Sequence, residues 1–311
     1  MTTEAPTAFE VTRVPVTSGH PVPTRRSTRM REAISSYIGV VPFLIYVAIF
    51  LLWPTYIVLV GAFQDPHGHP TLNNLHAITS SVYLKIFRNS IELSLVTALI
   101  GSICGGLLAW AVAGVKRGPL RQIVTAACGV LAQFGGVALA FAFLATFGFT
   151  GMVTVFLQQR FSIDLFASGA WLYDLPGLVL VYTYFQIPLM VIVFLPALDG
   201  LKPQWREASE TLGGTSWTFW RRVAGPILAP AFIGAMLLLF ANAFSAYATA
   251  AALVSQGSPI VSLKIGDLLT SEVNLNQANL AQALSFGMVV VVSVVMVLYA
   301  LLQRRTSRWL Q

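Results

Sequence analysis

Long apolar segments alternate with shorter polar ones along this chain. The apolar segments lie near 38–63, 90–114, 122–147, 176–198, 227–254 and 280–303. Each is longer than the roughly 20 residues that an α-helix needs to cross a bilayer. None shows the two-residue alternation that is typical of strands in an outer-membrane barrel. The pattern therefore predicts an all-α, polytopic membrane protein with six transmembrane helices.

Composition supports this interpretation. Hydrophobic residues make up 56% of the 311 positions and charged residues only 10%, whereas a soluble domain carries about a quarter charged residues. Residues 34–311 are expected to form one membrane domain. Residues 1–33 are polar and rich in Pro, Thr and Arg, without the apolar core of a signal peptide, and this pattern predicts a disordered cytoplasmic tail.

Basic residues predict the orientation. With the N-terminus inside, most of the 19 Lys and Arg residues fall in the inner pieces 1–37, 115–121, 199–226 and 304–311. Lys85, Arg88, Arg160 and Lys264 are left outside. Because inner loops carry the excess of positive charge, both termini are expected inside. The net charge of +7 then faces anionic lipid headgroups, and no basic soluble module is present that would favour nucleic-acid binding.

Enzymatic chemistry is not expected in this chain. Cys104 and Cys128 both lie in apolar segments, which argues against a disulfide framework or a zinc cluster. The sequence contains neither a Gly-x4-Gly-Lys-[Ser/Thr] phosphate loop nor a His-Glu-x-x-His pair. We therefore expect no metal site and no cofactor.

Polar and aromatic side chains within the apolar segments are candidates for a translocation path. They are Gln133, Tyr182, Tyr184, Gln186, Asn242, Ser245 and Tyr247. Interhelical hydrogen bonds are the alternative use of such residues. Glu92 lies at the outer end of the second segment, where the dipole of a helix N-terminus would stabilise a carboxylate; a cation site is the alternative.

Small residues and prolines interrupt these segments. Gly101, Gly105 and Gly106 predict close packing between helices. Pro188 and Pro196 predict kinks in the fourth segment, either as packing geometry or as a hinge for gating.

The inner piece 199–226 is amphipathic and is predicted to form two short helices. Pro203 can open the first helix, where its missing N–H does no harm. Gly213 and the following glycine can end it with a positive φ. Thr215 or Ser216 can then cap a second helix.

This piece also carries the most specific motif. Glu207-Ala208-Ser209, Gly213 and Val223-Ala224-Gly225-Pro226 keep the spacing of a Glu-Ala-Ala, Gly and Ile-x-Leu-Pro signature. The run resembles the signature of binding-protein-dependent ABC importer permeases, with Ser209, Val223 and Gly225 departing from it. In that family the segment is the coupling helix that is seated on the ATPase subunit. The resemblance implies that role for Glu207, Ala208, Ser209, Glu210, Leu212, Gly213 and Pro226; an amphipathic helix lying on lipid is the alternative.

The resemblance extends over residues 38–303. It includes Asn89-Ser90 and the run 239–244, and the sections 242–254 and 280–285 look most similar to permeases of the polyamine and aminoalkylphosphonate group. It implies an inner-membrane permease subunit that translocates a small polar solute by alternating access. The implied partners are ATP-binding cassette ATPase subunits, which hydrolyse the ATP, a second permease subunit (a copy or a homologue), an extracytoplasmic substrate-binding protein and membrane lipid. The alternatives are a permease for a sugar or other small solute, an ion-coupled secondary transporter and a membrane scaffold.

The orientation is testable with reporter fusions. Fusions at positions 70, 160 and 270 should report the outer side, and fusions at 118, 210 and 308 the inner side, because of the charge bias. A cytoplasmic signal from position 160 would contradict the assignment of the third and fourth spans.

Overall fold

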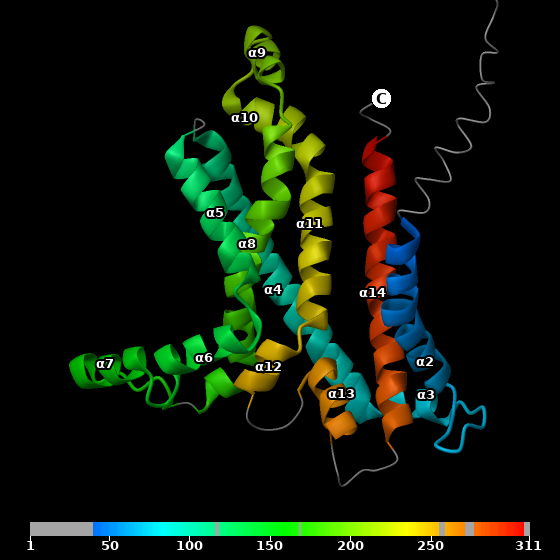
Figure 1. Cartoon of the computed structure of the whole chain (residues 1–311). Helices are drawn as coiled ribbons and strands as arrows, with labels where there is room; N and C mark the ends of the chain where they lie inside the picture. The colour runs from blue at the N-terminus through cyan, green and yellow to red at the C-terminus, as the bar shows by residue number, and fades with distance from the viewer. Residues whose placement is uncertain (1–39, 116–117, 168, 255–258, 271–276, 308–311) are drawn as a thin grey trace, which may run out of the picture. The chain divides into compact units, whose positions relative to one another are not determined.

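A computed structural model describes residues 40–115, 118–167, 169–254, 259–270 and 277–307 (Figure 1). The predicted tail 1–33 lies outside the described residues. The chain divides into two units, residues 1–56 and 57–311. Within the described residues every regular element is a helix, as the apolar pattern predicts.

The first unit contains the beginning of the first apolar helix, Val40–Gly61. A π-helical turn, η1 (Ala48–Leu52), precedes α2 (Trp53–Gly61). The amide of Trp53 donates to the carbonyl of Ala48, five residues back. Pro54 has no N–H and would clash with a normal helical carbonyl, so the wider turn just before it accommodates the proline.

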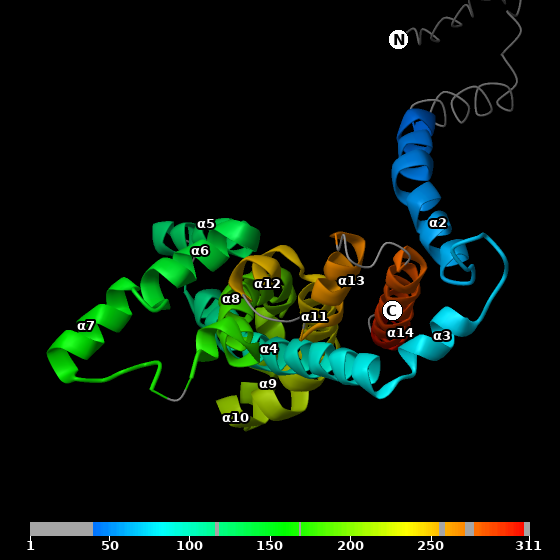
Figure 2. The same ribbon diagram turned by 90° about the horizontal axis from the view of Figure 1, so that it is seen from below.

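The second unit carries the remaining helices. They are α3 (Asn73–Ile78), α4 (Ser81–Gly114), α5 (Pro119–Gln133), α6 (Gly136–Phe147), α7 (Met152–Phe161), η2 (Trp171–Tyr173), α8 (Leu175–Asp199), α9 (Pro203–Thr211), α10 (Ser216–Phe219), η3 (Trp220–Ala224), α11 (Gly225–Ser245), α12 (Ala248–Leu253), α13 (Val261–Thr270) and α14 (Ala278–Ser307). The helices α4, α8 and α11 pack against one another, and α14 packs on α11. In both views α6 and α7 lead away from α8 and α11 (Figures 1 and 2).

Glycines set the distance between α4 and α8. A Cβ added at Gly105 would lie 2.5 Å from the Cβ of Met190 and 2.6 Å from the carbonyl oxygen of Ile187. At Gly101 it would lie 2.8 Å from the Cβ of Gln186. The predicted close packing is therefore confirmed, because neither site has room for a side chain.

Six helical stretches in the described part of the chain are long and apolar enough to cross a membrane. The prediction of six spans is confirmed in number, but the third span is placed differently. The segment 122–147 is not one helix, because α5 ends at Gln133 and α6 begins at Gly136, whose φ is +66°. Two consecutive glycines permit this break. The long apolar stretch is instead Gly136–Phe161, which reaches into the predicted outer loop 148–175.

The fifth segment, 227–254, is also interrupted. The helix α11 ends at Ser245, and Ala246 is extended before α12 begins. The carbonyl of Ala246 accepts hydrogen bonds from the hydroxyl of Tyr182 at 3.0 Å and from Ser262 Oγ at 3.1 Å. These side chains replace the helical partner that the break removes.

Glu92 does not lie at a helix N-terminus. The helix α4 begins at Ser81, so Glu92 lies in its interior, where the dipole explanation does not apply. Its carboxylate instead pairs with Arg88 Nε at 2.6 Å, one helical turn away.

The packing of α4 on α8 yields a stability prediction. Gly105→Ala should lower the melting temperature of the purified protein in detergent, since overpacking of this kind costs about 1–3 kcal/mol. Gly129→Ala is the matched control, because no atom lies within 4 Å of its Cβ position in α5. Equal melting temperatures for the two variants would contradict the close contact.

Candidate functional site

The candidate site is the helical hairpin of α9 and α10, residues 200–219. Figure 1 shows α9 beyond the ends of α8 and α11, at the end of the bundle where α14 finishes. Pro203 occupies the first turn of α9, as predicted, and Lys202 lies over the ring of Trp205 at 5.9 Å. The hairpin therefore extends beyond the end of the bundle, carried by α8, which precedes it, and α11, which follows it.

Local hydrogen bonds fix the end of α9. The amide of Gly214 donates to the carbonyl of Ser209 at 2.8 Å, and the amide of Gly213 donates to that of Glu210 at 3.0 Å. This pair of bonds is the Schellman motif. Gly213 has φ +78°, and a Cβ at Gly214 would lie 2.7 Å from the carbonyl oxygen of Ser209. The two glycines thus serve different needs, backbone conformation at Gly213 and space at Gly214.

The start of the second helix is capped by Thr215. Its hydroxyl accepts a hydrogen bond from the amide of Thr218 at 3.3 Å. Of the two capping candidates from the sequence, the structure therefore selects Thr215. From α10 the chain continues through the π-helical turn η3 into α11. The amide of Gly225 donates to the carbonyl of Trp220 just before Pro226, which repeats the arrangement seen at Pro54.

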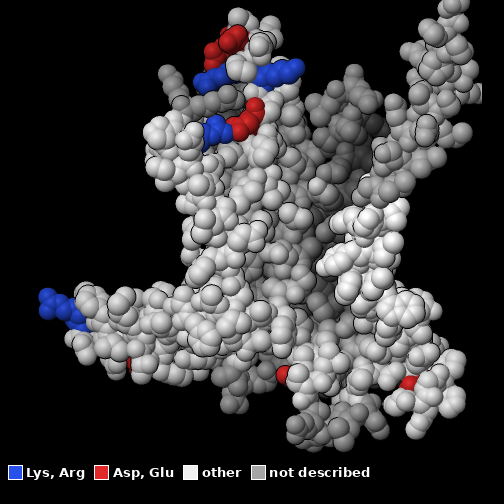
Figure 3. All heavy atoms as spheres, viewed as in Figure 1, with Lys and Arg blue, Asp and Glu red and all other residues white. Residues whose placement is uncertain are grey.

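Most of the residues predicted for coupling lie on the exposed side of this hairpin. Leu212 is 88% exposed, and Glu207, Ala208, Glu210 and Gly213 are also exposed, while Ser209 is half-buried. Pro226 is exposed as well, but it lies beyond the hairpin, in the first turn of α11. The carboxylate of Glu210 pairs with Arg206 Nε at 3.0 Å. Acidic and basic side chains gather at this end of the molecule (Figure 3). The hairpin thus presents a mixed apolar and charged surface.

Trp217 and Trp110 are two residues of this region that the motif does not identify. Trp217 in α10 is 73% exposed. Trp110, near the end of α4, contacts Trp220 edge to face, with ring centroids 6.0 Å apart. Their signal in the sequence is the position of tryptophans at the ends of apolar segments.

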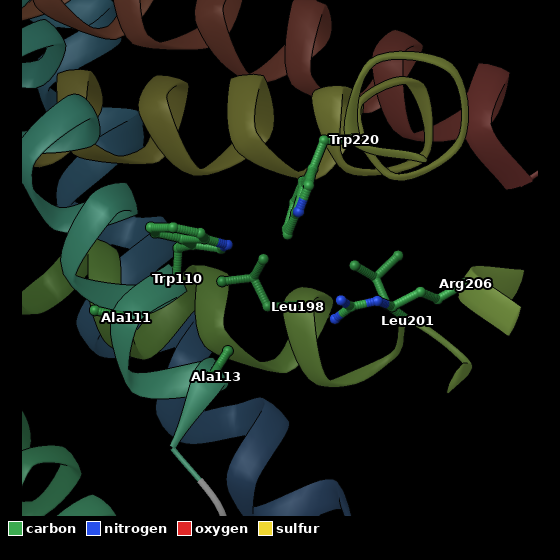
Figure 4. Close-up of a pocket in the computed structure, with 8 residues that line it drawn as sticks. Trp110, Ala111, Ala113, Leu198, Leu201, Arg206 and Trp220 are labelled. Carbon is green, nitrogen blue, oxygen red and sulfur yellow. The ribbon is translucent and has the colours of Figure 1, made fainter. Parts of the chain in front are cut away.

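A cleft of about 420 Å³ separates the base of α9 from the ends of the long helices (Figure 4). Its lining comes from α4, the α8–α9 region and η3. The residues are Trp110, Ala111, Ala113, Gly114, Leu198, Leu201, Arg206 and Trp220. The hairpin is therefore not packed flat against the ends of α4 and α8.

Two of the path candidates are fully buried between helices. The hydroxyl of Tyr182 bonds to Ala246, as described above, and Gln186 Nε2 donates to Thr97 Oγ1 at 2.8 Å. The Oε1 atom of Gln186 has no hydrogen-bond partner among the described residues. Both side chains therefore make interhelical hydrogen bonds, which is the alternative use given for these residues in the sequence analysis.

The other path candidates are more accessible. Tyr184 is half-buried and meets Phe143 edge to face at 5.7 Å. Gln133, Asn242, Ser245 and Tyr247 are exposed. They border two helix breaks that lie side by side, since a Cβ at Gly136 would be 3.7 Å from that of Ala248. The structure thus brings these exposed candidates to one region.

The described residues contain no cluster of three or more His, Cys, Asp or Glu side chains suited to a metal ion. Cys104 is exposed and Cys128 is buried, and both are free thiols.

The fold matches solved membrane transporters. In a crystal structure of a bacterial alginate ABC transporter in complex with an alginate pentasaccharide-bound periplasmic protein, the matched chain gives a TM-score of 0.68 at 19% identity. The match covers 89% of this chain and 96% of that one. A bacterial ABC transporter involved in the import of alginate gives a TM-score of 0.66 at 18% identity, covering 91% and 99% of the two chains. These likenesses show the fold.

Curated relatives match part of the chain. The sulfate transport system permease protein CysT of Salmonella typhimurium is 24% identical over 170 residues, which cover 55% of this chain and 58% of the relative. The trehalose transport system permease protein SugB of Mycobacterium tuberculosis is 26% identical over 177 residues, which cover 54% and 57%. The putative ferric transport system permease protein FbpB 1 of Haemophilus influenzae is 24% identical over 196 residues. Across these three relatives, the match spans 30% to 58% of the relative's length.

Residues 24–310 match the family described as binding-protein-dependent transport system inner membrane component. This match includes all of the long apolar helices and the hairpin of α9 and α10. The chain therefore belongs to the binding-protein-dependent transport system inner membrane component family.

Proposed function

We propose that this chain is the permease subunit of an ABC importer, a multi-pass inner-membrane protein with both termini inside. It translocates a small polar solute by alternating access, driven by ATP hydrolysis in partner ATPase subunits. The observation that carries the proposal is the exposed α9–α10 hairpin, whose glycine-ended geometry follows the permease motif.

The hairpin has the properties of an element that inserts into a groove of a soluble partner. A short amphipathic helix can dock by its apolar anchors, with charged residues beside them. Leu212 and Trp217 provide exposed apolar anchors, and Glu207 provides a charge on the same hairpin. We assign the coupling role to Glu207, Ala208, Ser209, Glu210, Leu212, Gly213 and Pro226, with an ATP-binding cassette ATPase as the partner.

The connections of the hairpin suit the transmission of movement. Only residues 200–202 separate α9 from α8, and α10 runs through η3 into α11 without a non-helical break. A displacement of α9 therefore acts on two long helices. The cleft at its base leaves room for the hairpin to move relative to the ends of α4 and α8.

The proposed assembly contains a second permease, either a copy or a homologue, two ATPase subunits and an extracytoplasmic binding protein. In one solved structure of similar fold, the transporter is in complex with a periplasmic protein. The proposed path runs past Gln133, Asn242, Ser245 and Tyr247, with Tyr182, Tyr184 and Gln186 supporting its wall. The large exposed apolar area of the long helices fits lipid and the second permease.

For the cargo, we propose a cationic or zwitterionic amine, such as a polyamine or an aminoalkylphosphonate. Support comes from the sequence similarity stated above and from six acidic residues on the proposed outer side, which are Asp65, Glu92, Asp164, Asp174, Asp267 and Glu272. Several of these acids also have local partners: Asp65 accepts from the amides of His69 and His67, and Asp174 caps α8. The bond from the amide of His69 is the main cause that lowers the pKa of Asp65, so this carboxylate stays charged. Steering by these charges is weak beyond about 8 Å at physiological salt, so the binding protein sets most of the specificity.

An ion-coupled secondary transporter is less well supported. Such a protein needs an ionisable residue in its spans that is available to the coupling ion. In the described part of α4, the Glu92 carboxylate is already paired with Arg88.

The coupling role predicts a contrast at Gly213. Gly213→Val should uncouple ATP hydrolysis from uptake in the reconstituted importer, because a β-branched residue at φ +78° costs on the order of 1–3 kcal/mol. Gly213→Asn is the matched control, since Asn tolerates this conformation and no atom crowds its Cβ position. Wild-type uptake by the Val variant at normal membrane levels would overturn the coupling assignment.

The cargo proposal is tested by uptake of labelled spermidine, putrescine and 2-aminoethylphosphonate into cells that express the complete importer. At least one should accumulate in an ATP-dependent way, and cells lacking this permease are the control. Accumulation of a sugar but of none of the three would refute the amine cargo and leave the permease assignment intact.

A further inference from the structure

One ion pair in the described part of the chain joins two separate long helices. Arg121, in the first turn of α5, donates from Nη2 to Oδ2 of Asp199, the last residue of α8. The other pairs found among the described residues, such as Arg88 with Glu92 and Arg206 with Glu210, link positions four apart in the sequence. The pair is partly buried, with side chains 19% and 42% exposed. It therefore fixes tertiary geometry, whereas the others act within one local segment.

The pair lies at the root of the hairpin. Asp199 is separated from Pro203, the first residue of α9, by three residues. A displacement of α9 reaches Asp199 before it reaches any other residue of α8. Arg121 is thus bound to the point where the movement enters the long helices.

Packing between α5 and α8 is incomplete beside the pair. Val124 and Cys128 of α5 belong to an apolar cluster with Leu198. Next to them lies an open cleft of about 580 Å³, lined by Thr125 and Gly129 on one side and by residues of α8 on the other. The ion pair therefore closes an interface that side chains leave partly open.

The far end of α5 is a joint. The helix ends at Gln133, and Gly136 has φ +66° where α6 begins. With 15 residues, α5 is about 22 Å long at 1.5 Å per residue. The helix is thus a short rod with the ion pair to Asp199 at one end and a glycine joint, beside α12, at the other.

We propose that Arg121 and Asp199 are positioning residues for coupling. The ion pair makes α5 follow the displacement of α9, so that the region around Gln133 changes its exposure as the ATPases close. This inference rests on the proposed function and adds a second output of the hairpin, independent of the continuous helix from α10 through η3 to α11.

The test uses the complete importer with one reporter cysteine at a time. Gln133→Cys reports on α5, and Ser245→Cys reports on α11, both in a Cys104→Ala, Cys128→Ala background. The measurement is the rate of labelling by a membrane-impermeant maleimide, with and without ATP and vanadate. In the parent importer, nucleotide should change the rate severalfold at both positions.

Breaking the pair separates the two outputs. Asp199→Asn or Arg121→Gln should abolish the nucleotide-dependent change at position 133 and leave the change at position 245. The exchanged pair, Arg121→Asp with Asp199→Arg, should restore the response at 133. If the pair had a merely structural role, the single variants would lower the nucleotide-dependent change in labelling at both positions together. The exchanged pair would then restore that change at both positions, and not at 133 alone.

Each of the other possible results contradicts one part of the proposal. A full response at 133 in the single variants, or none at 133 in the parent while 245 responds, overturns the link. Failure of the exchanged pair to restore 133 overturns the role of the charges. Absence of any response at both positions in the parent overturns the proposed importer function, and the link with it.

Discussion

The arrangement of this protein depends on the close contact between α4 and α8. In a bilayer, lipid is as apolar as the side chains, so helices associate through packing and polar contacts. Gly101 and Gly105 let the backbone of α4 approach Gln186 and Met190 directly. The amide of Gln186 then bonds to Thr97 across the same interface. With α8 held in this way, its end defines where the hairpin begins.

Irregular backbone in the other helices occurs where the polar groups of the main chain find new partners. At the end of α11, the freed carbonyl of Ala246 is bonded by Tyr182 and Ser262. At Pro54 and Pro226, a π-helical turn lets the preceding amide bond five residues back. Unpaired backbone groups are costly in hydrocarbon, which confines joints to such places. The rigid rods and the joints between them follow from this constraint.

The sequence predicts those features that depend on local chemistry. Hydropathy gives the number of spans, and the glycines at Gly213 and Gly214 give the end of α9, because both signals lie within the element itself. The break after Ser245 depends on Tyr182, which is 64 residues from the carbonyl it bonds, so a window of neighbouring residues cannot reveal it. Burial of Gln186 likewise depends on a partner helix. The polar residues of the spans can therefore be named from sequence, but their surroundings cannot.

Two routes lead from the hairpin into the membrane helices, and they converge. One is the helix through η3 into α11, which ends at the break after Ser245. The other, in our proposal, passes through Asp199 and Arg121 to α5, which ends at the break before Gly136. Those two breaks adjoin, at Gly136 and Ala248. A single displacement of α9 would therefore act on both sides of one junction. Movement of α5 relative to α11 changes the exposure of the side chains at that junction more than movement of either helix alone.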